Sequence, residues 1–470
     1  MNSRDSVTIK EAIKKSGLKN GMTISFHHHL REGDEVVLKT LSEIKELGIK
    51  NLTLSCTSLL NAHDKIVDYI EDGTITSIHT TGLKAKLAKY VVHKGLKTPV
   101  IFRSHGGRAR ALQEKNINVD VAFISAAAVD SLGNATGSLG KNSFGSLGYG
   151  IWEAQNANKV IIVTDNVIKN DVLPYISIPQ YRVNEVVSVD SIGNSSKIKA
   201  GSLIPKFSYN NFIIAKKTAE IIINLAGSLN NKSLQLGSGS ISIQVMKFIS
   251  EHLKRKNEKL KFMLGGITEF ILEAFNENLV QTIFDIQSFS PECSYFIGKN
   301  PSYIEIDSSW YANPKVNCLV NYVDFSVLSA VEIDLNWNVN SLISSDYEII
   351  GAIGGHQDVA EGSNITIITA PLIRGRIPII VDKVKAVTTP GKNVDILVTD
   401  FGIAVNPLRK DIINDLLSLD IEIFSLKDLY KKAEDLVGIP EKPKLSDKVV
   451  GIIENRTGEI IDYIYCKEGD

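Results

Sequence analysis

Residues 21–34, with the sequence GMTISFHHHLREGD, place three consecutive histidines and an arginine directly after a short β-type run. Successive strand residues point to opposite faces, so His27, His28 and His29 cannot all fill a hydrophobic core, and at least one is expected to face a cleft or water. Imidazoles and the Arg31 guanidinium can hold carboxylates or phosphates. The segment indicates either anion binding with acid–base chemistry or a solvent-exposed basic loop.

A second set of such residues, RSHGGRAR, also follows an apolar, strand-like run. Gly106 and Gly107 permit close backbone approach, which suits contact with a thioester or a phosphate. Arg108 and Arg110 can clamp carboxylates through paired N–H donors, with His105 beside them. The alternative is a surface turn that opens a helix, with its arginines pointing to water.

Two glycine turns, LGSGS and GGITE, lie in the second half of the chain. Gly237 and Gly239 precede a helix whose first amides attract anions, yet the turn lacks the lysine of a P-loop and the full dinucleotide pattern. Gly265 and Gly266 precede Glu269. That glutamate is either a helix-dipole partner or a carboxylate nucleophile that accepts an acyl group and then forms a thioester.

A third turn, GAIGGHQD, precedes the arginine-containing RGRIP. The amides of Gly354 and Gly355 can form an oxyanion hole with the imidazole of His356 close by. Arg374 and Arg376 add two side chains suited to anions.

A pair of carboxylates, Glu332 and Asp334, lies on one face of an otherwise apolar strand in SAVEID. Buried carboxylates need polar partners, so these are either sheet-edge residues or members of a site, with Glu332 the stronger catalytic candidate. Together the motifs predict acyl or phosphoryl chemistry on an anionic substrate.

Composition limits the remaining classes of protein. The chain has 470 residues, more than one core of about 250 to 300 residues accommodates, so two large domains are expected. With 52 basic and 53 acidic residues, overall charge gives no attraction to nucleic acid or membrane. Four cysteines lack CxxC spacing and the histidines lack an HExxH pattern, which predicts a cytoplasmic protein without a structural metal or disulfides. No uncharged apolar stretch reaches the ~18 residues of a membrane span.

The elements that position these motifs alternate between β-branched runs and amphipathic helical runs. Strands are expected at residues 22–26, 51–55, 100–103, 119–124, 159–164 and 185–189, and helices at 35–47, 65–71 and 83–94. Strands that are apolar on both faces and separated by helices predict a parallel sheet covered on both sides.

The pattern restarts with a helix at residues 212–225. Further strands are expected at residues 234–236, 261–264, 325–333, 364–368, 378–381 and 394–398. We therefore expect two similar open α/β domains, residues 1–205 and 206–470. The motifs fall at strand ends, so the site is predicted in the cleft between the domains.

The motifs quoted above, with GKNSFGSLGYG, YANP, NVN and GIAVNP, occur in one order from about residue 10 to residue 410. In this arrangement the chain resembles the alpha subunit of citrate lyase. The second half also resembles CoA-transferases, in which a glycine loop, a nucleophilic-glutamate segment and a GGQxD turn occupy corresponding places. The resemblance implies a CoA-transferase fold and a transferase of the kind used in citrate fermentation and acetyl-CoA metabolism.

In that family the subunit exchanges acetyl for citrate on the thiol of an acyl-carrier protein, which releases acetate and forms a citryl thioester. It also acts as a citrate CoA-transferase. The implied partners are a beta subunit that cleaves the citryl group and a gamma carrier subunit, within a larger complex that contains further copies of the chain. CoA or the carrier's phosphoribosyl-dephospho-CoA arm is then a substrate, and no cofactor or metal is covalently held.

The resemblance also assigns possible roles to individual residues. Glu269 matches the CoA-transferase nucleophile, whereas His356 stands where those enzymes have glutamine. The citrate lyase family is associated with direct transfer through a mixed anhydride, so a covalent glutamyl thioester remains an alternative. Acetate- or succinate-type CoA-transferase and citramalate lyase alpha subunit are the alternative functions, with malonate as a further possible substrate.

Overall fold

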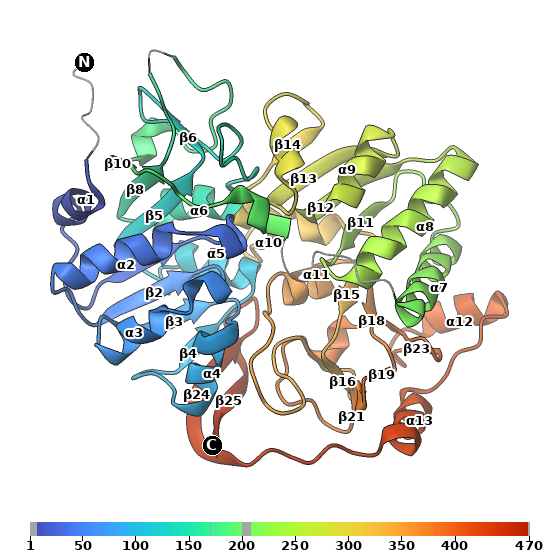
Figure 1. The fold of residues 1–470 in the computed structure, drawn as a ribbon. Coiled ribbons are helices and arrows are strands. Elements are labelled where there is room, and N and C mark those ends of the chain that lie inside the picture. The colour runs from blue at the N-terminus through green and yellow to red at the C-terminus, as the bar shows by residue number, and fades with distance from the viewer. Residues whose placement is uncertain (1–6, 170, 200–207, 469–470) are drawn as a thin grey trace.

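The computed structural model describes residues 7–169, 171–199 and 208–468 (Figure 1). Two α/β halves lie side by side. The first is blue to green and the second green to orange in Figure 1. Each half is built on an open, mainly parallel sheet. The predicted fold class is therefore confirmed.

The first sheet has the strand order β10-β8-β5-β1-β2-β3-β4-β24-β25, parallel throughout except for the last pair. Its strands are β1 (Thr23–Phe26), β2 (Leu52–Cys56), β3 (Ile75–Thr80), β4 (Val100–Phe102), β5 (Val121–Ala126), β8 (Lys159–Thr164), β10 (Glu185–Ser188), β24 (Leu445–Glu454) and β25 (Ile460–Lys467). The sequence analysis did not predict β3, β24 or β25.

Helices of the first half occupy two layers. Their bounds are α1 (Ile9–Ser16), α2 (Val36–Glu46), α3 (Ile66–Glu71), α4 (Ala85–His93), α5 (His105–Gln113) and α6 (Gly148–Asn156). The first four contact one another in chain order, whereas α5 and α6 pack against the second half. The helix α5 begins where Ser104 accepts the amide of Gly107, as expected for an N-cap serine.

The second sheet has the order β14-β13-β12-β11-β15-β18-β22-β23 and is parallel except for its last pair. The strands are β11 (Ser233–Leu236), β12 (Leu260–Ile267), β13 (Val280–Ser288), β14 (Tyr303–Glu305), β15 (Phe325–Ser329), β18 (Ile365–Thr369), β22 (Ile396–Val398) and β23 (Ile403–Val405). The helices are α7 (Tyr209–Ala226), α8 (Ser240–Lys256), α9 (Glu269–Asn276), α10 (Ser308–Ala312), α11 (His356–Gly362), α12 (Lys410–Ser418) and α13 (Leu426–Val437).

Small sheets reveal that the two halves repeat one plan. In the first, β6 (Ala128–Asp130) pairs with β7 (Ala135–Thr136) and β9 (Val167–Ile168); in the second, β16 (Glu332–Asp334) pairs with β17 (Val339–Asn340) and β21 (Ile380–Val381). Asp130 and Asp334 hold equivalent turns by accepting amides of the residues that follow. A two-stranded ribbon, β19 (Ile373–Arg374) and β20 (Ile377–Pro378), is additional. The run predicted as one strand at residues 325–333 is thus divided between β15 and β16.

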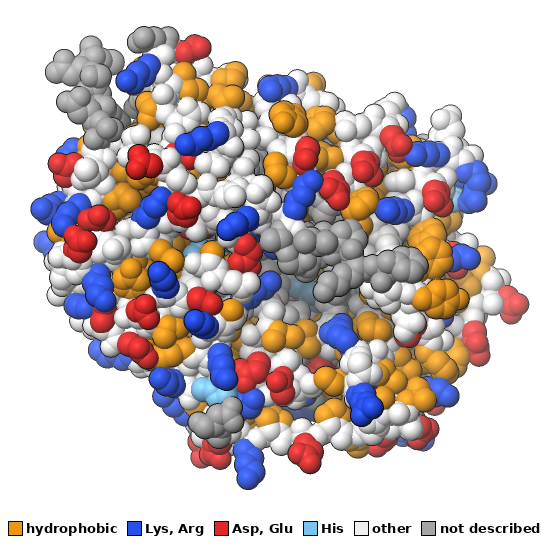
Figure 2. Space-filling model, viewed as in Figure 1, with side chains coloured by type: hydrophobic (Ala, Val, Ile, Leu, Met, Phe, Trp, Pro, Cys, Tyr) orange, Lys and Arg blue, Asp and Glu red, His pale blue; other side chains and the backbone are white. Residues whose placement is uncertain are grey.

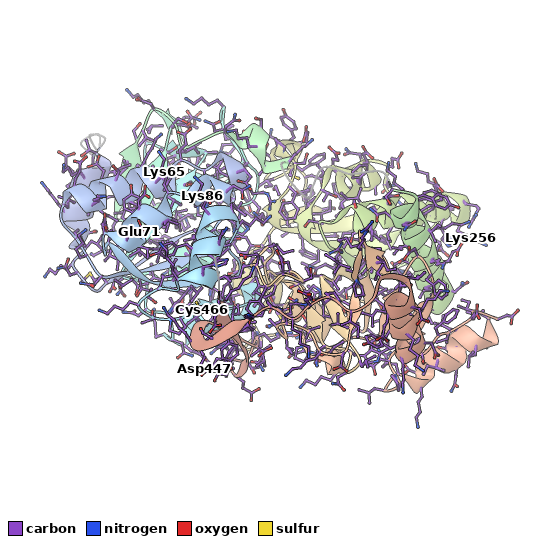
Figure 3. The ribbon with its side chains drawn as sticks, turned by 60° about the horizontal axis from the view of Figure 1, so that its bottom comes forward. Lys65, Glu71, Lys86, Lys256, Asp447 and Cys466 are labelled. Carbon is purple, nitrogen blue, oxygen red and sulfur yellow. The ribbon has the colours of Figure 1, made fainter. Side chains whose placement is uncertain are left out.

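The C-terminal hairpin departs from the expected division at residue 206. Strand β24 pairs in parallel with β4, so residues 445–467 extend the first sheet rather than the second. Asp447 and Cys466 mark this hairpin in Figure 3, and the chain reaches it from α13 along the second half. The two sheets are therefore joined by covalent connections at both ends of the second half.

The surface in Figure 2 intermingles acidic and basic side chains and is hollowed between the halves. In the described part of the chain, no helix is both long and apolar enough to cross a bilayer. One buried apolar cluster fills the second half, and two others include residues from both halves, of which the larger forms the core of the first half.

Candidate active site in the cleft between the halves

A cavity of about 470 Å³, here called the first cavity, lies between the two halves at the carboxyl ends of several strands. Open α/β sheets bind ligands at this edge. Residues that the sequence analysis singled out contribute from both halves: His28, Arg31, His105, Gly237, Gly239, Gly266, Gly354, Gly355, His356 and Arg374. The predicted convergence of these motifs on one cleft is present in the structure.

The three histidines after β1 divide between the cavity and its wall. His28 lines the cavity, and its backbone amide and ring Nδ1 both contact the Thr57 hydroxyl. His29 is buried behind it, where its Nε2 accepts the amide of Tyr149 at 3.3 Å. His27 is buried against His29 and Phe144. The three histidines lie in the turn beyond the end of β1, and of these three His28 lines the cavity.

The imidazoles of the cavity are neutral near pH 7. Burial lowers the pKa of His105 to about 3 and that of His356 to about 4, and it also lowers the pKa of His28 well below its ordinary value. These rings act as hydrogen-bonding groups rather than cations.

Arg31 provides a cation in the first cavity. Its guanidinium lies 5.0 Å from the ring centroid of Phe289, and its buried Nε has no hydrogen-bond partner among the described residues. The backbone at Arg31 has φ +52°, an uncommon conformation for a residue with a side chain. An unpaired, partly desolvated cation in a strained turn is suited to bind an anion.

Lys84 and Arg374 complete the positive charge. Lys84 precedes α4 and is half-buried, and burial lowers its pKa. Arg374 donates to the carbonyl of Ala330 at 3.1 Å. No Asp or Glu is among the described residues that line the cavity. The electrostatics therefore favour a polyanionic ligand.

Neutral donors surround these cations. The hydroxyl of Tyr149 lies 3.0 Å from Nε2 of His105, and Gln235 donates to the hydroxyl of Tyr311 at 2.8 Å. Burial raises the pKa of both tyrosines, so both phenols stay protonated. Nδ1 of His105 and Oε1 of Gln235 have no partner among the described residues. These atoms are available to a bound ligand.

Glycine is required at two turns because other groups approach closely. A Cβ at Gly355 would lie 2.3 Å from the hydroxyl of Tyr311, and one at Gly266 would lie 2.1 Å from the ring of Phe289. Gly354 has φ +54°. Gly265, with φ +108°, packs against Gln235 behind the cavity. The turns thus bring backbone to the cleft, as expected for oxyanion contacts.

His356 lines the first cavity, but both of its ring nitrogens are engaged. Nε2 lies 3.2 Å from the carbonyl of Ser329, to which it must donate, so Nδ1 accepts from the hydroxyl of Thr389 at 2.8 Å. In this arrangement His356 orders the wall of the cavity and has no free lone pair to act as a base.

Two arginines predicted to bind substrate have other partners. Arg108 is buried in contact with Glu153 and Ser55. Arg110 contacts Glu114 and lies 3.5 Å from Glu454. Neither lines the first cavity. The prediction that Arg108 and Arg110 bind substrate is therefore wrong. A buried guanidinium group needs polar partners, and both arginines find theirs within the protein.

The glycines of SHGGRAR connect the halves instead of facing the first cavity. The amide of Gly106 donates to Asp358 at 2.9 Å, and a Cβ there would lie 2.1 Å from the carbonyl of Ala312. The amide of Gly107 donates to Ser104. Asp358 of the GGHQD turn thereby caps α5 across the interface, which differs from the thioester contact expected for Gly106 and Gly107.

The predicted carboxylates and Arg376 also lie away from the first cavity. Glu332 is buried in contact with Lys385 and accepts the amide of Asn340 at 2.9 Å. Glu269 forms a half-exposed ion pair of 2.9 Å with Lys199. Arg376 is exposed. The roles predicted for these three residues therefore receive no support from their positions.

Several lining residues were missed in the sequence analysis: Lys84, Tyr149, Gln235, Gln287, Phe289, Tyr311 and Ser329. Tyr149 is the next-to-last residue of the motif GKNSFGSLGYG and Gln235 precedes LGSGS, so attention to the polar residues in and beside the glycine motifs would have found them. Lys84 and Phe289 follow strands that were not predicted. Among the described residues, no group of three or more His, Cys, Asp or Glu is arranged to hold a metal ion.

Comparison with known proteins agrees with this geometry. A family model for the alpha subunit of citrate lyase matches residues 3–466. The citrate lyase alpha chain of Haemophilus influenzae is 40% identical over 459 residues, 97% of this chain and 92% of the relative. That of Klebsiella pneumoniae is 39% identical over 458 residues, 97% and 90% respectively. The chain therefore spans nearly the whole length of these relatives.

Solved structures show the same fold. A crystal structure from Streptococcus mutans, described as the alpha subunit of citrate lyase in complex with citrate, has a TM-score of 0.96 and 40% identity and covers 100% of this chain and 93% of its own. The malonate decarboxylase alpha subunit of Acinetobacter baumannii has a TM-score of 0.67 at 14% identity, covering 93% and 94%. The latter likeness concerns the fold alone.

The two repeated sheets with a positively charged cleft between them, together with the family match, are those of an acyltransferase of the CoA-transferase type. Within that class, the chain belongs to the citrate lyase alpha-subunit family. Membership of this family makes the chain an enzyme that works together with other subunits.

Proposed function

We propose that the chain transfers the thiol of an acyl carrier from acetyl to citrate, with acetyl carrier and citrate as substrates and acetate and citryl carrier as products. The observation that carries this proposal is the first cavity. It gathers Arg31, Lys84 and Arg374 without an acidic side chain among its described lining, in a member of this family. Three cations match the three carboxylates of citrate.

The reaction needs no proton from the protein. A carboxylate oxygen of citrate attacks the acetyl carbonyl carbon, the carbon–sulfur bond breaks, and a mixed anhydride and a thiolate form. The thiolate then attacks the citryl carbonyl, the anhydride carbon–oxygen bond breaks, and acetate leaves. Each step develops negative charge on a carbonyl oxygen, for which backbone amides near Gly237, Gly239, Gly354 and Gly355 are suitable donors.

Neutral side chains have a complementary role in this proposal. If Tyr149 donates to Nε2 of His105, the free Nδ1 of His105 carries a proton and can donate to a carboxylate of citrate; the free oxygen of Gln235 can accept from its hydroxyl group. Partial enclosure of the site limits hydrolysis of the anhydride. The function of the protein is thus mainly to orient two substrates and stabilise charge.

We further propose that the thiol belongs to CoA or to the phosphoribosyl-dephospho-CoA arm of a gamma carrier subunit, and that neither is covalently held by this chain. A beta subunit would cleave the citryl product within a cytoplasmic complex that contains further copies of the chain. The alternatives, a CoA-transferase with a glutamyl thioester and a citramalate lyase alpha subunit, are not favoured by the family match. Malonate is also less favoured as the substrate.

One assay tests the proposed reaction. The purified chain is incubated with acetyl-CoA or acetylated carrier protein and with citrate, citramalate, malonate or acetate. Acetate release and the new thioester are measured by mass spectrometry. Citrate is expected to give the fastest transfer and a citryl thioester; faster transfer to citramalate or malonate would contradict the assignment.

A further inference from the structure

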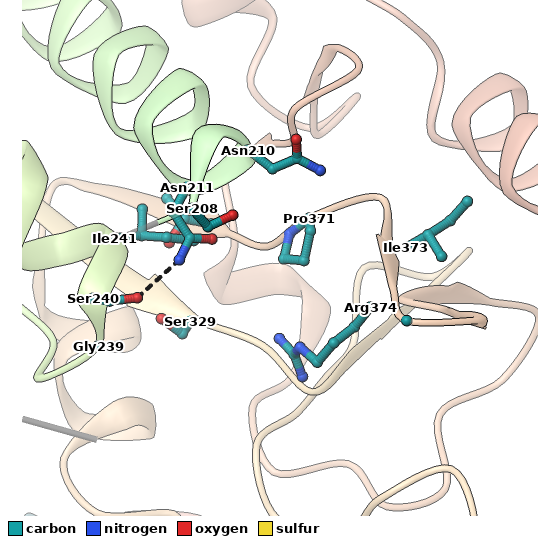
Figure 4. Close-up of a pocket in the computed structure, with 12 residues that line it drawn as sticks. Ser208, Asn210, Asn211, Gly239, Ser240, Ile241, Ser329, Pro371, Ile373 and Arg374 are labelled. Atoms are coloured by element: carbon teal, nitrogen blue, oxygen red, sulfur yellow. Dashed lines mark hydrogen bonds between the residues drawn. The ribbon is translucent and has the colours of Figure 1, made fainter. Parts of the chain in front are cut away.

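A second cavity, of about 460 Å³, lies at the starts of α7 and α8 and beside β19 (Figure 4). It adjoins the first cavity, since Gly239, Ser329 and Arg374 line both. Each volume falls in the range of about 300 to 1,000 Å³ typical of small-molecule sites. The proposed reaction brings together two substrates, and citrate accounts only for the first cavity.

The lining of the second cavity is polar. Ser208 and Ser240 contribute hydroxyl groups and Asn210 and Asn211 contribute side-chain amides, whereas the hydroxyl of Thr369 donates to the carbonyl of Leu328. The amide of Asn211 donates to Ser240 at 3.0 Å, the contact drawn in Figure 4. No carboxylate is among the described residues that line this cavity. An acyl chain would gain little here, whereas a phosphate would find several donors.

Arg374 carries the positive charge at the junction. Figure 4 shows its guanidinium extending from β19 toward Ser329. It donates to the carbonyl of Ala330 and forms no ion pair with a carboxylate in the described part of the chain. Its remaining donors are thus available to an anion.

Two helix starts add to this charge without side-chain caps. Ser208 precedes α7 and Gly239 precedes α8, and neither makes a side-chain capping hydrogen bond. The first amides of both helices therefore retain donor capacity beside the arginine. Asp400 is an acidic group close to the start of α7, and its carboxylate already accepts the side-chain amide of Asn210 and the backbone amide of Leu372.

From the shared junction and this lining we infer that the second cavity binds the phosphate-bearing part of the thiol arm. The arm is a CoA-like or phosphopantetheine-type thioester, and its acyl end passes Gly239, Ser329 and Arg374 into the first cavity. This inference rests on the proposed function and adds a location for the second substrate. The transfer step itself is unchanged.

The test compares acetyl-CoA with S-acetylpantetheine, an acyl donor that lacks phosphate. Asn211→Asp places a negative charge in the second cavity, away from the first, and Asp is favoured in the first turn of a helix. The variant is expected to raise the KM for acetyl-CoA about tenfold. The KM for S-acetylpantetheine and the KM for citrate are expected to change less than twofold.

Asn224→Asp is the matched control, because it makes the same charge change at the exposed far end of α7. It is expected to leave the KM for acetyl-CoA and the KM for S-acetylpantetheine unchanged. Arg374→Gln is a second variant. It is expected to raise the KM for acetyl-CoA more than the KM for S-acetylpantetheine, even if it also raises the KM for citrate. Equal effects on both donors in Asn211→Asp, or none, would overturn the inference.

Calorimetric titration with CoA and with pantetheine separates this inference from the proposed function. If the wild-type chain transfers nothing to citrate yet binds CoA more tightly than pantetheine, and Asn211→Asp removes that preference, the subsite stands and the assigned reaction fails. If transfer to citrate proceeds but CoA and pantetheine bind alike, the subsite fails and the reaction stands.

Discussion

Arg31 combines three features that are unusual for a residue whose role is to stabilise the fold. Its backbone φ is +52°, its Nε is buried without a partner among the described residues, and its guanidinium faces the ring of Phe289 instead of a carboxylate. The positive φ and the unpartnered Nε raise the free energy of the ligand-free protein, whereas the contact with the ring is favourable but gives the charge no counter-ion. A bound carboxylate would offset them, which links the local instability to binding.

Replacement of Arg31 by Gln is therefore expected to weaken citrate binding and to spare the fold. A charge-assisted hydrogen bond contributes about 1.5 to 3 kcal/mol, so the KM for citrate should rise about tenfold to a hundredfold. Without citrate, the variant should unfold at the same or a higher temperature than the wild type. Steady-state kinetics and thermal unfolding measure both effects.

An unchanged KM with a lower unfolding temperature would contradict this role for Arg31. Arg182→Gln is a suitable control, because Arg182 is exposed beside Tyr181 and lines neither cavity.

A substitution at Glu269 distinguishes direct transfer from a covalent glutamyl thioester mechanism. It resembles a CoA-transferase nucleophile by motif, but it pairs with Lys199 and lines neither cavity. Direct transfer predicts that Glu269→Ala lowers kcat by less than about tenfold, whereas loss of a covalent nucleophile would lower it by several orders of magnitude. The measurement is single-turnover transfer from acetyl-CoA to citrate, with hydroxylamine trapping of any protein thioester. A trapped adduct on wild type alone would favour the covalent route.

At the scale of elements, the C-terminal hairpin is held to the first sheet by charge as well as by backbone pairing. Glu454, at the end of β24, makes two hydrogen bonds of 2.7 Å to Arg103 and lies 3.5 Å from Arg110. Both arginine side chains are almost completely buried. The hairpin thus neutralises Arg103 and helps to neutralise Arg110, two of the three arginines of the RSHGGRAR segment.

Glu454→Gln should lower the free energy of unfolding by about 3 kcal/mol, since a buried pair that loses one partner leaves an uncompensated charge. Chemical unfolding of the full chain measures the loss. Glu422→Gln, at an exposed position, should have no comparable effect. Equal stability of the two variants would show that the arginines have other sufficient partners.

The sequence predicts elements well where a short run is strongly apolar on both faces. Residues 159–164 were predicted as a strand with the bounds that β8 has, and β1 and β2 were placed within one residue at each end. The hairpin was missed because β24 and β25 carry charged residues, which suggest a solvated tail, and their pairing with β4 spans about 350 residues. Sequence patterns report local burial and not distant pairing.

The site shows the same limit. His28, Arg31 and the glycine turns follow strand ends and could be predicted from that position alone. Arg108 and Arg110 lie in an equally suggestive motif, but Arg108 pairs with the buried Glu153 of α6, and Arg110 pairs with Glu114 at the end of its own helix and with Glu454 of β24. Motif chemistry gives the possible partners of a residue, whereas the tertiary structure decides which partner is bound.

At the scale of the whole molecule, the two halves meet through polar contacts that shape the cleft. Ser146 donates to the carbonyl of Asp285, and the amide of Leu147 donates to Glu305 at 2.6 Å. Asp358 accepts Ser104 and Gly106 on the opposite side of the interface. Tyr149 and His105, which line the first cavity, lie within three residues of these contacts in the sequence. The alignment of the two halves therefore also sets the geometry of the first cavity.

Asp285 makes this interface sensitive to pH. Its Oδ2 accepts Ser288 and Tyr303 at 2.6 Å each, its Oδ1 has no partner among the described residues, and burial raises its pKa from 3.8 to about 7. The folded state therefore binds this proton more tightly than the unfolded state does. The resulting stabilisation is complete below about pH 3.8 and is lost as the pH rises through about 7.

Asp285→Asn should remove this dependence, because the amide is neutral at every pH. Between pH 5 and pH 8 the wild type should lose more stability than the variant, by about 3 kcal/mol. Urea unfolding at pH 5, 6.5 and 8 measures the difference, with the exposed Asp447→Asn as control. Parallel pH profiles for wild type and Asp285→Asn would mean that the carboxylate is ionised within the interface, and its charge would then have to be balanced there by groups other than Ser288 and Tyr303.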